Sequence, residues 1–464
     1  MSGASAPVFT GRLVRRGDPD YDDARVGRVF NARRPDRHPI AVLLAETEAD
    51  VVAGVRLARA EGWSVAVRAG GHSWAAWSVR DGSLLIDLGH FAAVDYDPAT
   101  GVAAAGPAAR GGLDLDPVLA AHGRAFPGGH CASVGIGGFL LQGGQGWNSR
   151  SQGWACESVV GIDVVTADGD LVHADAEHHA DLLWAARGAG PGFPGVITRF
   201  HLRTYPRPAV MAHDTWTFRL DDAGALLGWL HDILPGLDTR VEPVVAATRL
   251  PDVPLDTGVA RPDGTVLLLH TTVLAESRAE IDAMLAPFDD CPLADRRLGH
   301  VRAETDIAQE NEAQTEQNPE GHRYVVDCTW TNASAAELAE PLSALWRDLP
   351  TMHSFSIWYG WAPSRPLPDM AFSVEANVYL ATYVIYTDPA DDERHSAFVH
   401  GRTDQLAALG GAGVYLGDTD FVRRTDRFLS DENYARLQEI NRRRDPGGLF
   451  CSYLVGDVTR LNSR

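Results

Sequence analysis

Two reactive side chains stand among glycines in this chain. His72 follows Gly70 and Gly71 in the stretch RAGGHSW, and Cys131 lies 59 positions later, directly after His130. The paired glycines can turn the backbone with a positive φ and bring successive amide groups to an anion such as a diphosphate. A cysteine placed among glycines beside a histidine can act as a nucleophile if its thiolate is favoured.

Each feature also has an ordinary structural explanation. A glycine pair is most often a turn, and a lone cysteine is most often a small buried apolar residue. The cysteine, however, belongs to a run from Pro127 to Trp147 that holds eight glycines in 21 residues. Such a run offers a long backbone surface to a flat, polyanionic molecule. It lacks the lysine of a phosphate loop and the spacing of a Rossmann site, which excludes both kinds of nucleotide site.

A strand, helix and strand over 40–68 position the first glycine pair. Thr47 with Asp50 predicts a capping box at the start of the helix, and Gly62 ends the helix before the strand WSVAVR. The second strand delivers its carboxyl end to RAGGHSW. In α/β arrangements ligands bind at that end of the strands.

The rest of the chain falls into two parts around 205–208, the stretch YPRP. Before it we expect strands over 83–88 and 102–105, a helix over 112–122 and a hairpin at Asp168-Gly169. After it come longer alternating strands, predicted over 264–275, 353–361 and 372–388. In the last of these, Tyr379 and Tyr383 share one face, which could line a site.

Charge and composition exclude several classes of protein. The chain has 41 basic and 62 acidic residues, a net charge of −21, which disfavours nucleic acid and anionic lipid as partners. It shows no apolar run of the length of a signal peptide or a membrane span. Five scattered cysteines fit neither a disulfide framework nor a zinc site, so no metal site is predicted. We expect a soluble cytoplasmic protein, a monomer or homodimer, that acts on a small molecule.

The glycine-rich stretches resemble the flavin-attachment signature of a known family. RAGGHS with GGHC-x-x-VGIGG is similar to the motifs of the FAD-linked oxidases of the berberine bridge enzyme type, in the vanillyl-alcohol oxidase superfamily. The likeness continues through SRSQGWACESVVGIDVVTADG, GFPGVITRF and NYARLQEINRRRDPGGLF. In that family the histidine bonds to the flavin 8α-methyl carbon and the cysteine to C6. The resemblance therefore implies an FAD attached covalently to both His72 and Cys131.

The resemblance also implies which other residues hold the cofactor. Besides His72 and Cys131, the residues expected to contact the FAD are Arg68, Gly70, Gly71, Ser73, Val134, Gly137, Gly138, Gly143, Gly144, Gly195, Val196 and Tyr453. Val134 occupies the position that gates oxygen access in this family. A small valine there is similar to the oxidases, whereas a leucine is similar to the dehydrogenases, although core packing would also explain the valine.

The catalytic base is less well defined than the cofactor site. Sugar-oxidising relatives carry a tyrosine base in a pattern such as Tyr-x-Asn-Tyr-x-Asp. The matching stretch here begins at Tyr415 and places Asp418 at the base position. Burial beside the flavin would raise the pKa of such a carboxyl toward a useful value, but Asp418 could equally be a turn residue. Tyr379 and Tyr383 offer a second route, because Tyr383 roughly matches a position that is catalytic in relatives.

The expected architecture is a two-domain α+β fold of the PCMH type. Residues 1–205 form an FAD-binding domain of two α+β subdomains, and 206–410 form a substrate-binding domain built on an antiparallel β-sheet covered by helices. Residues 411–464 return to the FAD-binding domain.

Three functions are compatible with these features. The leading one is a flavoprotein oxidase that oxidises an alcohol group of a sugar, or of a glycosylated or polycyclic natural product, by hydride transfer to flavin N5, with O2 reduced to H2O2. The second is oxidative cyclisation or dehydrogenation of a secondary metabolite, including amine substrates. The third is a flavin-bearing resistance or sequestration protein.

Overall fold

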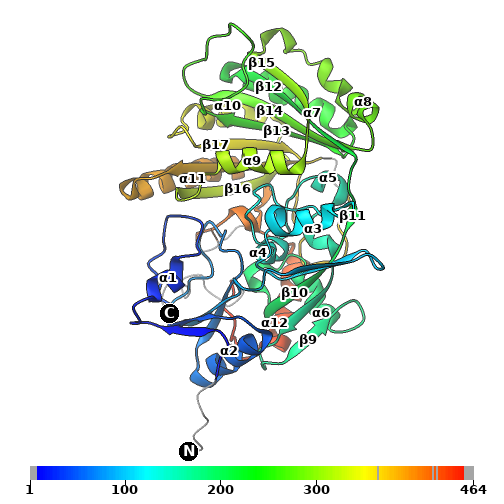
Figure 1. The fold of residues 1–464 in the computed structure, drawn as a ribbon. Coiled ribbons are helices and arrows are strands. Elements are labelled where there is room, and N and C mark those ends of the chain that lie inside the picture. The colour runs from blue at the N-terminus through cyan, green and yellow to red at the C-terminus, as the bar shows by residue number, and fades with distance from the viewer. Residues whose placement is uncertain (1–7, 363–364, 421–422, 425–426, 454–464) are drawn as a thin grey trace, which may run out of the picture.

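The chain folds around three main β-sheets (Figure 1). The structure is a computed structural model and describes residues 8–362, 365–420, 423–424 and 427–453. Two smaller sheets occupy the lower half of the view, and an eight-stranded sheet occupies the upper half. This arrangement confirms the two-domain α+β fold expected from the sequence.

The first sheet delivers the RAGGHSW stretch. Its order is β1-β2-β4-β3, with β2 and β3 parallel to β4 and β1 antiparallel to β2. The elements are β1 (Arg12–Arg15), α1 (Tyr21–Val26), β2 (Ala41–Leu44), α2 (Glu48–Glu61), β3 (Ser64–Arg68) and β4 (Ser83–Asp87). Thr47 and Asp50 form the predicted capping box of α2, and Gly62 ends that helix with φ of 69°.

The second sheet lies beside the first in the N-terminal region, residues 8–206. It is antiparallel, in the order β5-β6-β10-β8-β9, and Asp168-Gly169 forms the predicted hairpin between β8 and β9. Its strands are β5 (Val94–Asp97), β6 (Val102–Ala105), β8 (Val159–Val165), β9 (Leu171–Ala174) and β10 (Val196–Arg203), and a small ribbon pairs β7 (Arg124–Ala125) with β11 (Tyr205–Pro206).

Short helices connect these strands. They are η1 (Gly111–Leu115), α3 (Asp116–Ala120), α4 (Ile136–Leu141), α5 (Ser149–Gln152), η2 (Ala155–Ser158), α6 (Ala180–Ala186) and η3 (Gly190–Gly192). The helix predicted over 112–122 is therefore interrupted: its first part, η1, is a π-helical turn, and α3 begins only at Asp116, directly before Pro117. Proline is well tolerated in the first turn of a helix, where its missing N–H costs nothing.

The third sheet is wholly antiparallel, in the order β15-β12-β14-β13-β17-β18-β16-β19. Its strands are β12 (Val210–Arg219), β13 (Val241–Thr248), β14 (Val266–Ala275), β15 (Gly299–Thr305), β16 (Arg323–Thr331), β17 (Phe355–Gly360), β18 (Val378–Tyr386) and β19 (Gly411–Gly413). The helices that accompany it are η4 (Leu220–Asp222), α7 (Ala223–Ile233), η5 (Leu234–Gly236), α8 (Arg278–Asp289), η6 (Ala294–Arg296), α9 (Ile307–Gln317), α10 (Ala335–Arg347), η7 (Pro389–Asp391) and α11 (Asp392–Ala407). Apolar side chains of α7, α8 and α10 bury one face of the sheet, whereas α9 contacts η1 of the N-terminal region.

The end of the described chain returns to the first two sheets. After η8 (Leu416–Asp418), helix α12 (Asp431–Arg444) packs on α6, and Phe450 forms a parallel bridge with Val65 of β3. Ser430 caps α12 by accepting the N–H of Asn433. β19, by contrast, pairs with β16 and so lies in the eight-stranded sheet.

The strand predicted over 372–388 begins later than expected. Only Val378–Tyr386 forms β18. The N–H of Phe372 instead donates to the carbonyl of Arg187, next to α6. The apolar alternation of this stretch therefore reflects burial against the N-terminal region, including Trp154 and Cys156, and not pairing within the sheet.

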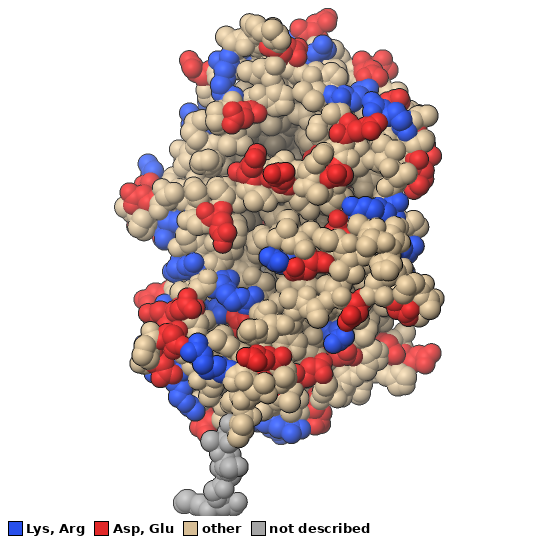
Figure 2. All heavy atoms as spheres, viewed as in Figure 1, with Lys and Arg blue, Asp and Glu red and all other residues tan. Residues whose placement is uncertain are grey.

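No helix within the described ranges is both long enough and apolar enough to cross a membrane. On the face drawn in Figure 2, acidic and basic side chains are interspersed, and acidic side chains border a hollow in its upper half.

Candidate cofactor and substrate site

One large cavity brings the predicted reactive residues together. Its volume is about 930 Å³, and its walls come from the loop after β3, from the 129–147 stretch, from the eight-stranded sheet and from η8. His72, Cys131, Tyr383 and Asp418 all line it. Segments more than 280 residues apart in the sequence (131 to 418) thus face the same space.

The glycines of the wall leave room that a cofactor can fill. A Cβ on Gly70 would lie 2.7 Å from the backbone nitrogen of Gly135, and Gly71 has φ of +82°, so larger residues are excluded at both positions. A Cβ on Gly138 would meet nothing within 4 Å, although Gly138 lines the cavity. Gly70 and Gly71 therefore let the loop pack against the backbone of Gly135 and Arg28, and Gly138 leaves open space on the cavity wall.

His72 is held in place and kept neutral. Its ring stacks on Phe30 with centroids 4.3 Å apart, and its Nε2 lies 3.1 Å from the hydroxyl of Ser133. Burial lowers the pKa of His72 to about 4, a shift that the contact with Ser133 opposes. At neutral pH one ring nitrogen therefore keeps its lone pair, which bond formation to carbon requires.

Cys131 is a thiol, not a thiolate, in these surroundings. Burial raises its pKa to about 12, and the charge of Asp418 contributes in the same direction. The sequence suggested that Cys131 could act as a nucleophile if its thiolate were favoured. The described neighbours favour the neutral thiol instead.

Arg68 stabilises the protein around the cofactor loop. Its side chain is almost fully buried, pairs with Asp87 and donates to the backbone carbonyls of Ala24 and Arg25. Arg68 lines the cavity, as expected of a cofactor residue. Its positive charge, however, is already paired with the carboxylate of Asp87.

The other predicted cofactor residues divide into two groups. Those that line the cavity are Gly70, Gly71, Ser73, Val134, Gly137, Gly138 and Gly195. Gly143, Gly144, Val196 and Tyr453 are not among the described residues of its wall. Gly143 and Gly144 instead give space to aromatic rings, since Cβ atoms there would meet Phe372 and Phe139. The Tyr453 hydroxyl donates to the carbonyl of Ala189, and Val196 lies in the core.

Asp418 is the centre of a hydrogen-bonded cluster. The hydroxyls of Tyr379 and Tyr383 donate to its Oδ2 at 2.6 Å and 2.7 Å, and the indole N–H of Trp74 donates to its Oδ1 at 2.8 Å. The two tyrosines are four positions apart on β18 and share a face, as predicted. Burial, followed by the charge of Asp418, raises the pKa of both phenols well above the usual value of 10.

The predicted catalytic residues differ in access. Tyr383, Tyr415 and Asp418 line the cavity, whereas Tyr379 is not among the described residues of its wall and is fully buried. Tyr415 accepts the backbone N–H of Gln145 through its hydroxyl at 3.2 Å. Tyr383 is thus the tyrosine that can connect Asp418 to a ligand.

A second polar cluster in the cavity was missed from the sequence. His213 Nδ1 donates to Oε1 of Glu310 at 2.8 Å, and His270 Nε2 lies 3.4 Å from Oε2 of the same carboxylate. The hydroxyl of Thr215 lies 2.8 Å from the Nδ1 of His270, its partner across β12 and β14. The available signal was polar residues, such as His270 and Thr272, alternating within the apolar run VLLLHTTVLA.

The charges of the cavity wall are mostly negative. Its acidic residues are Glu242, Asp252, Glu310, Glu316 and Asp418, and Arg68 is the single lysine or arginine among the described wall residues. Because Arg68 is paired with Asp87, the wall favours neutral or cationic ligands over carboxylates and phosphates in the substrate region.

Comparison with known sequences relates nearly the whole chain to FAD-linked oxidoreductases. The FAD binding domain family matches residues 39–175. The chain is 35% identical over 453 residues to the FAD-linked oxidoreductase ptmO of Penicillium ochrochloron, and this alignment covers 96% of each protein. It is also 36% identical over 214 residues to a carbohydrate oxidase of Microdochium nivale, covering 46% of this chain and 41% of that protein.

Solved structures share the fold at lower identity. 6-Hydroxy-D-nicotine oxidase of Arthrobacter nicotinovorans superposes with a TM-score of 0.83 at 21% identity, over 98% of this chain and 99% of that one. The BBE-like 1 protein of Physcomitrella patens superposes with a TM-score of 0.81 at 19% identity, over 97% and 98% of the two chains.

Proposed function

Because the chain belongs to the FAD-linked oxidoreductases, we propose that it is an oxidase of the berberine bridge enzyme type with a bicovalently attached flavin. Its substrate is an alcohol group of a sugar, or of a glycosylated or polycyclic natural product, and O2 is the electron acceptor that leaves as H2O2. The observation that carries this proposal is the placement of His72, Cys131, Tyr383 and Asp418 on one cavity.

The residues around the glycine pair are suited to hold the cofactor. Gly70, Gly71 and Ser73 would bind the diphosphate through backbone and hydroxyl donors, while His72 and Cys131 would carry the two covalent bonds. FAD bound here would supply a two-electron acceptor for hydride from a substrate carbon. Val134 lines the same wall, and its small side chain would leave oxygen access to the flavin.

Tyr383 and Asp418 provide a route for the substrate proton. Tyr383 lines the cavity and donates its own hydroxyl hydrogen to Asp418. As the carbon of a substrate alcohol loses hydride, its O–H proton would pass to the Tyr383 oxygen while the Tyr383 proton passes to Oδ2 of Asp418. The carboxylate thus becomes the final proton acceptor, and no free phenolate forms.

The second polar cluster would orient the substrate. Glu310 can accept a hydrogen bond from a substrate hydroxyl or ammonium group, and His213 and His270 keep its carboxylate in position. The negative wall also favours the second candidate, dehydrogenation of an amine substrate, because a protonated amine would be attracted to Glu310 and Asp418.

The covalent linkage is tested by acid precipitation of the purified protein. The pellet of the wild type should stay yellow, His72→Ala and Cys131→Ala should each keep one linkage, and the double variant should release its flavin. Cys451→Ala and His130→Ala are the matched controls, because both residues line the same cavity but carry no bond in this proposal. A colourless wild-type pellet with a yellow supernatant would disprove covalent attachment. It would leave the proposal of FAD binding intact.

The proton route is tested by removing one hydroxyl at a time. Tyr383→Phe should slow anaerobic flavin reduction by roughly 100-fold, the lower range for loss of general base catalysis. Tyr379→Phe removes an equivalent hydrogen bond to Asp418 but no group on the cavity wall, so its effect should be smaller. Equal effects of Tyr383→Phe and Tyr379→Phe would contradict a relay through Tyr383.

The substrate class is identified by measuring peroxide release with a panel of oligosaccharides and amines.

A further inference from the structure

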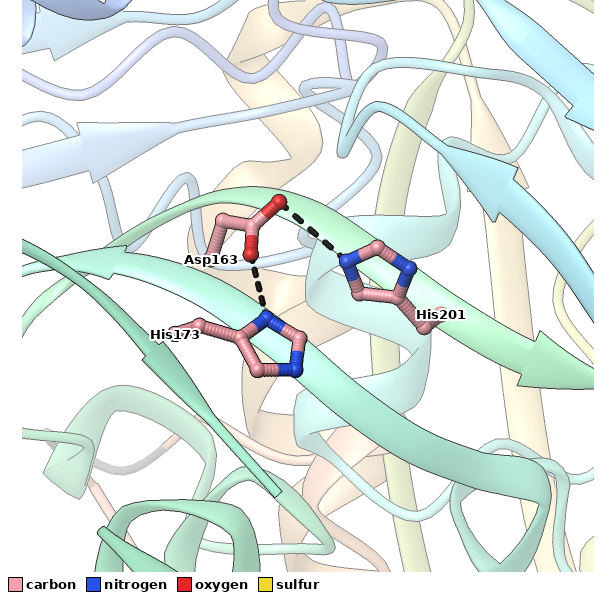
Figure 3. Close-up of side chains that lie close together, drawn as sticks. All are labelled: Asp163, His173 and His201. Atoms are coloured by element: carbon pink, nitrogen blue, oxygen red, sulfur yellow. Dashed lines mark hydrogen bonds and ion pairs between the residues drawn. The ribbon is translucent and has the colours of Figure 1, made fainter. Parts of the chain in front are cut away.

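Two histidines and an aspartate converge on the open face of the second sheet. His173 Nδ1 lies 2.7 Å from Oδ1 of Asp163, and His201 Nε2 lies 3.2 Å from Oδ2 (Figure 3). Among the described residues, this is the one group of at least three such side chains whose ligand atoms all lie within 4.8 Å of one another. None of the three belongs to the described wall of the flavin cavity.

The strand register fixes these side chains on one face. Asp163 of β8 is the direct partner of His173 on β9, and His201 of β10 pairs with Gly161, two residues along β8 from Asp163. Side chains two positions apart point to the same side of a strand. The opposite face packs into the core through residues such as Ile162 and Phe200, so the backbone under the cluster is held rigidly.

A second carboxylate lies near one of the histidines. Oδ2 of Asp175 lies 3.7 Å from Nε2 of His173, the nitrogen that faces away from Asp163. Asp175 is itself held by the backbone N–H groups of Glu177 and His178, at 2.8 Å and 2.7 Å. At 3.7 Å the contact between Asp175 and His173 is an ion-pair distance and not a hydrogen bond. A shortening of this contact on metal binding would orient the ring, as carboxylates behind metal-binding histidines do.

We propose that Asp163, His173 and His201 form a binding site for a divalent transition metal ion, with Zn²⁺ as the preferred biological occupant. Two imidazoles and one carboxylate form a ligand set of the kind that zinc takes with water in the fourth position. Zn–N and Zn–O bonds of about 2.0 Å in a tetrahedral site separate the ligand atoms by about 3.3 Å. The observed separations of 2.7 Å and 3.2 Å are measured to the two different oxygens of Asp163, and the shorter one would have to lengthen by about 0.6 Å when an ion binds.

Access and a local competitor set the expected strength. His173 is 48% exposed, so an ion can enter from solvent without opening the fold. Arg199 is the competing cation: its Nε lies 3.9 Å from Oδ2 of Asp163, and its Nη1 lies 3.9 Å from Asp95. Neither distance is a hydrogen bond. The guanidinium can therefore turn to Asp95 when an ion occupies the site.

The test is a titration of the chelator-treated, flavin-containing protein with Zn²⁺, followed by isothermal calorimetry. We expect one equivalent to bind with micromolar affinity. Asp163→Asn, His173→Ala and His201→Ala should each weaken binding at least tenfold, whereas Arg199→Gln should strengthen it. His178→Ala is the matched control, because His178 is an exposed neighbour that contacts Asp175 and not Asp163.

Two further readouts keep the outcome unambiguous. Co²⁺ should give the visible absorption of a tetrahedral complex at wavelengths beyond the flavin bands, and His173→Ala should abolish it. An unchanged flavin spectrum in each variant shows that the fold and the cofactor site are intact. Absence of stoichiometric Zn²⁺ binding, or binding that survives both histidine variants, overturns the metal site and leaves the proposed oxidase function untouched.

Discussion

The protein contains two clusters in which one carboxylate lies between two histidines, and their surroundings differ. In the cavity, Glu310 of α9 meets His213 and His270 at 2.8 Å and 3.4 Å. On the second sheet, Asp163 meets His173 and His201 at 2.7 Å and 3.2 Å. The side chain of Glu310 is 6% exposed, and that of Asp163 is 23% exposed. Similar residues and distances thus give a substrate-facing group in one place and an open metal site in the other.

Electrostatics follow the same difference. Burial by itself would raise the pKa of Glu310, but hydrogen bonds from His213 and His270 lower it well below its usual value of 4.5. For Asp163 the opposing effect is again burial, and His201 and His173 lower its pKa from 3.8. Both carboxylates are ionised at neutral pH. Glu310 is buried on the cavity wall and so faces ligands of the cavity, whereas Asp163 is more exposed to ions from solvent.

The largest expected effect separates the two clusters by activity. Glu310→Gln should lower kcat/KM by about 10- to 100-fold, because a hydrogen bond to a charged group contributes roughly 1.5–3 kcal/mol. Asp163→Asn should leave kcat/KM unchanged. Steady-state peroxide assays of the two variants with the same flavin content measure the contrast. Equal losses would mean that the two clusters do not differ in function.

A smaller effect should separate them by stability. At ten times its dissociation constant, Zn²⁺ should add about 1.4 kcal/mol to the free energy of unfolding of the wild type, which raises the melting temperature by a few degrees. Glu310→Gln should keep this gain and His173→Ala should lose it. Differential scanning calorimetry with and without Zn²⁺ provides the measurement. A gain that persists in His173→Ala would place the ion elsewhere.

The smallest difference should appear in acid. A carboxyl whose pKa is lower in the folded state stabilises the fold above its unfolded pKa, and this contribution is lost as the pH falls. For Glu310 the loss begins near pH 4.5 and for Asp163 near pH 3.8. Denaturant unfolding between pH 6 and pH 3.5 should therefore show a shallower fall in stability for Glu310→Gln than for the wild type, and little change for Asp163→Asn. An identical pH profile for wild type and Glu310→Gln would contradict the lowered pKa.

Local features could be predicted because they depend on residues close in the sequence. The capping box at Thr47, the turn at Gly169 and the shared face of Tyr379 and Tyr383 require only neighbouring side chains and the two-residue period of a strand. The first part of the strand predicted over 372–388 was wrong, because alternation predicts only burial on one side. A strand also needs a distant pairing partner, and the backbone N–H of Phe372 donates to the carbonyl of Arg187 instead.

The sequence by itself determined the family, the glycine-lined attachment of His72 and Cys131 as a prediction, and the local starts and ends of several elements. Tertiary structure decided which polar residues meet. His213, His270 and Glu310 come together only through the pairing of β12 with β14 and the position of α9, and Asp163, His173 and His201 only through the register of three strands. Register is set by burial of whole sheet faces against the core, a property of the complete chain that no short stretch encodes.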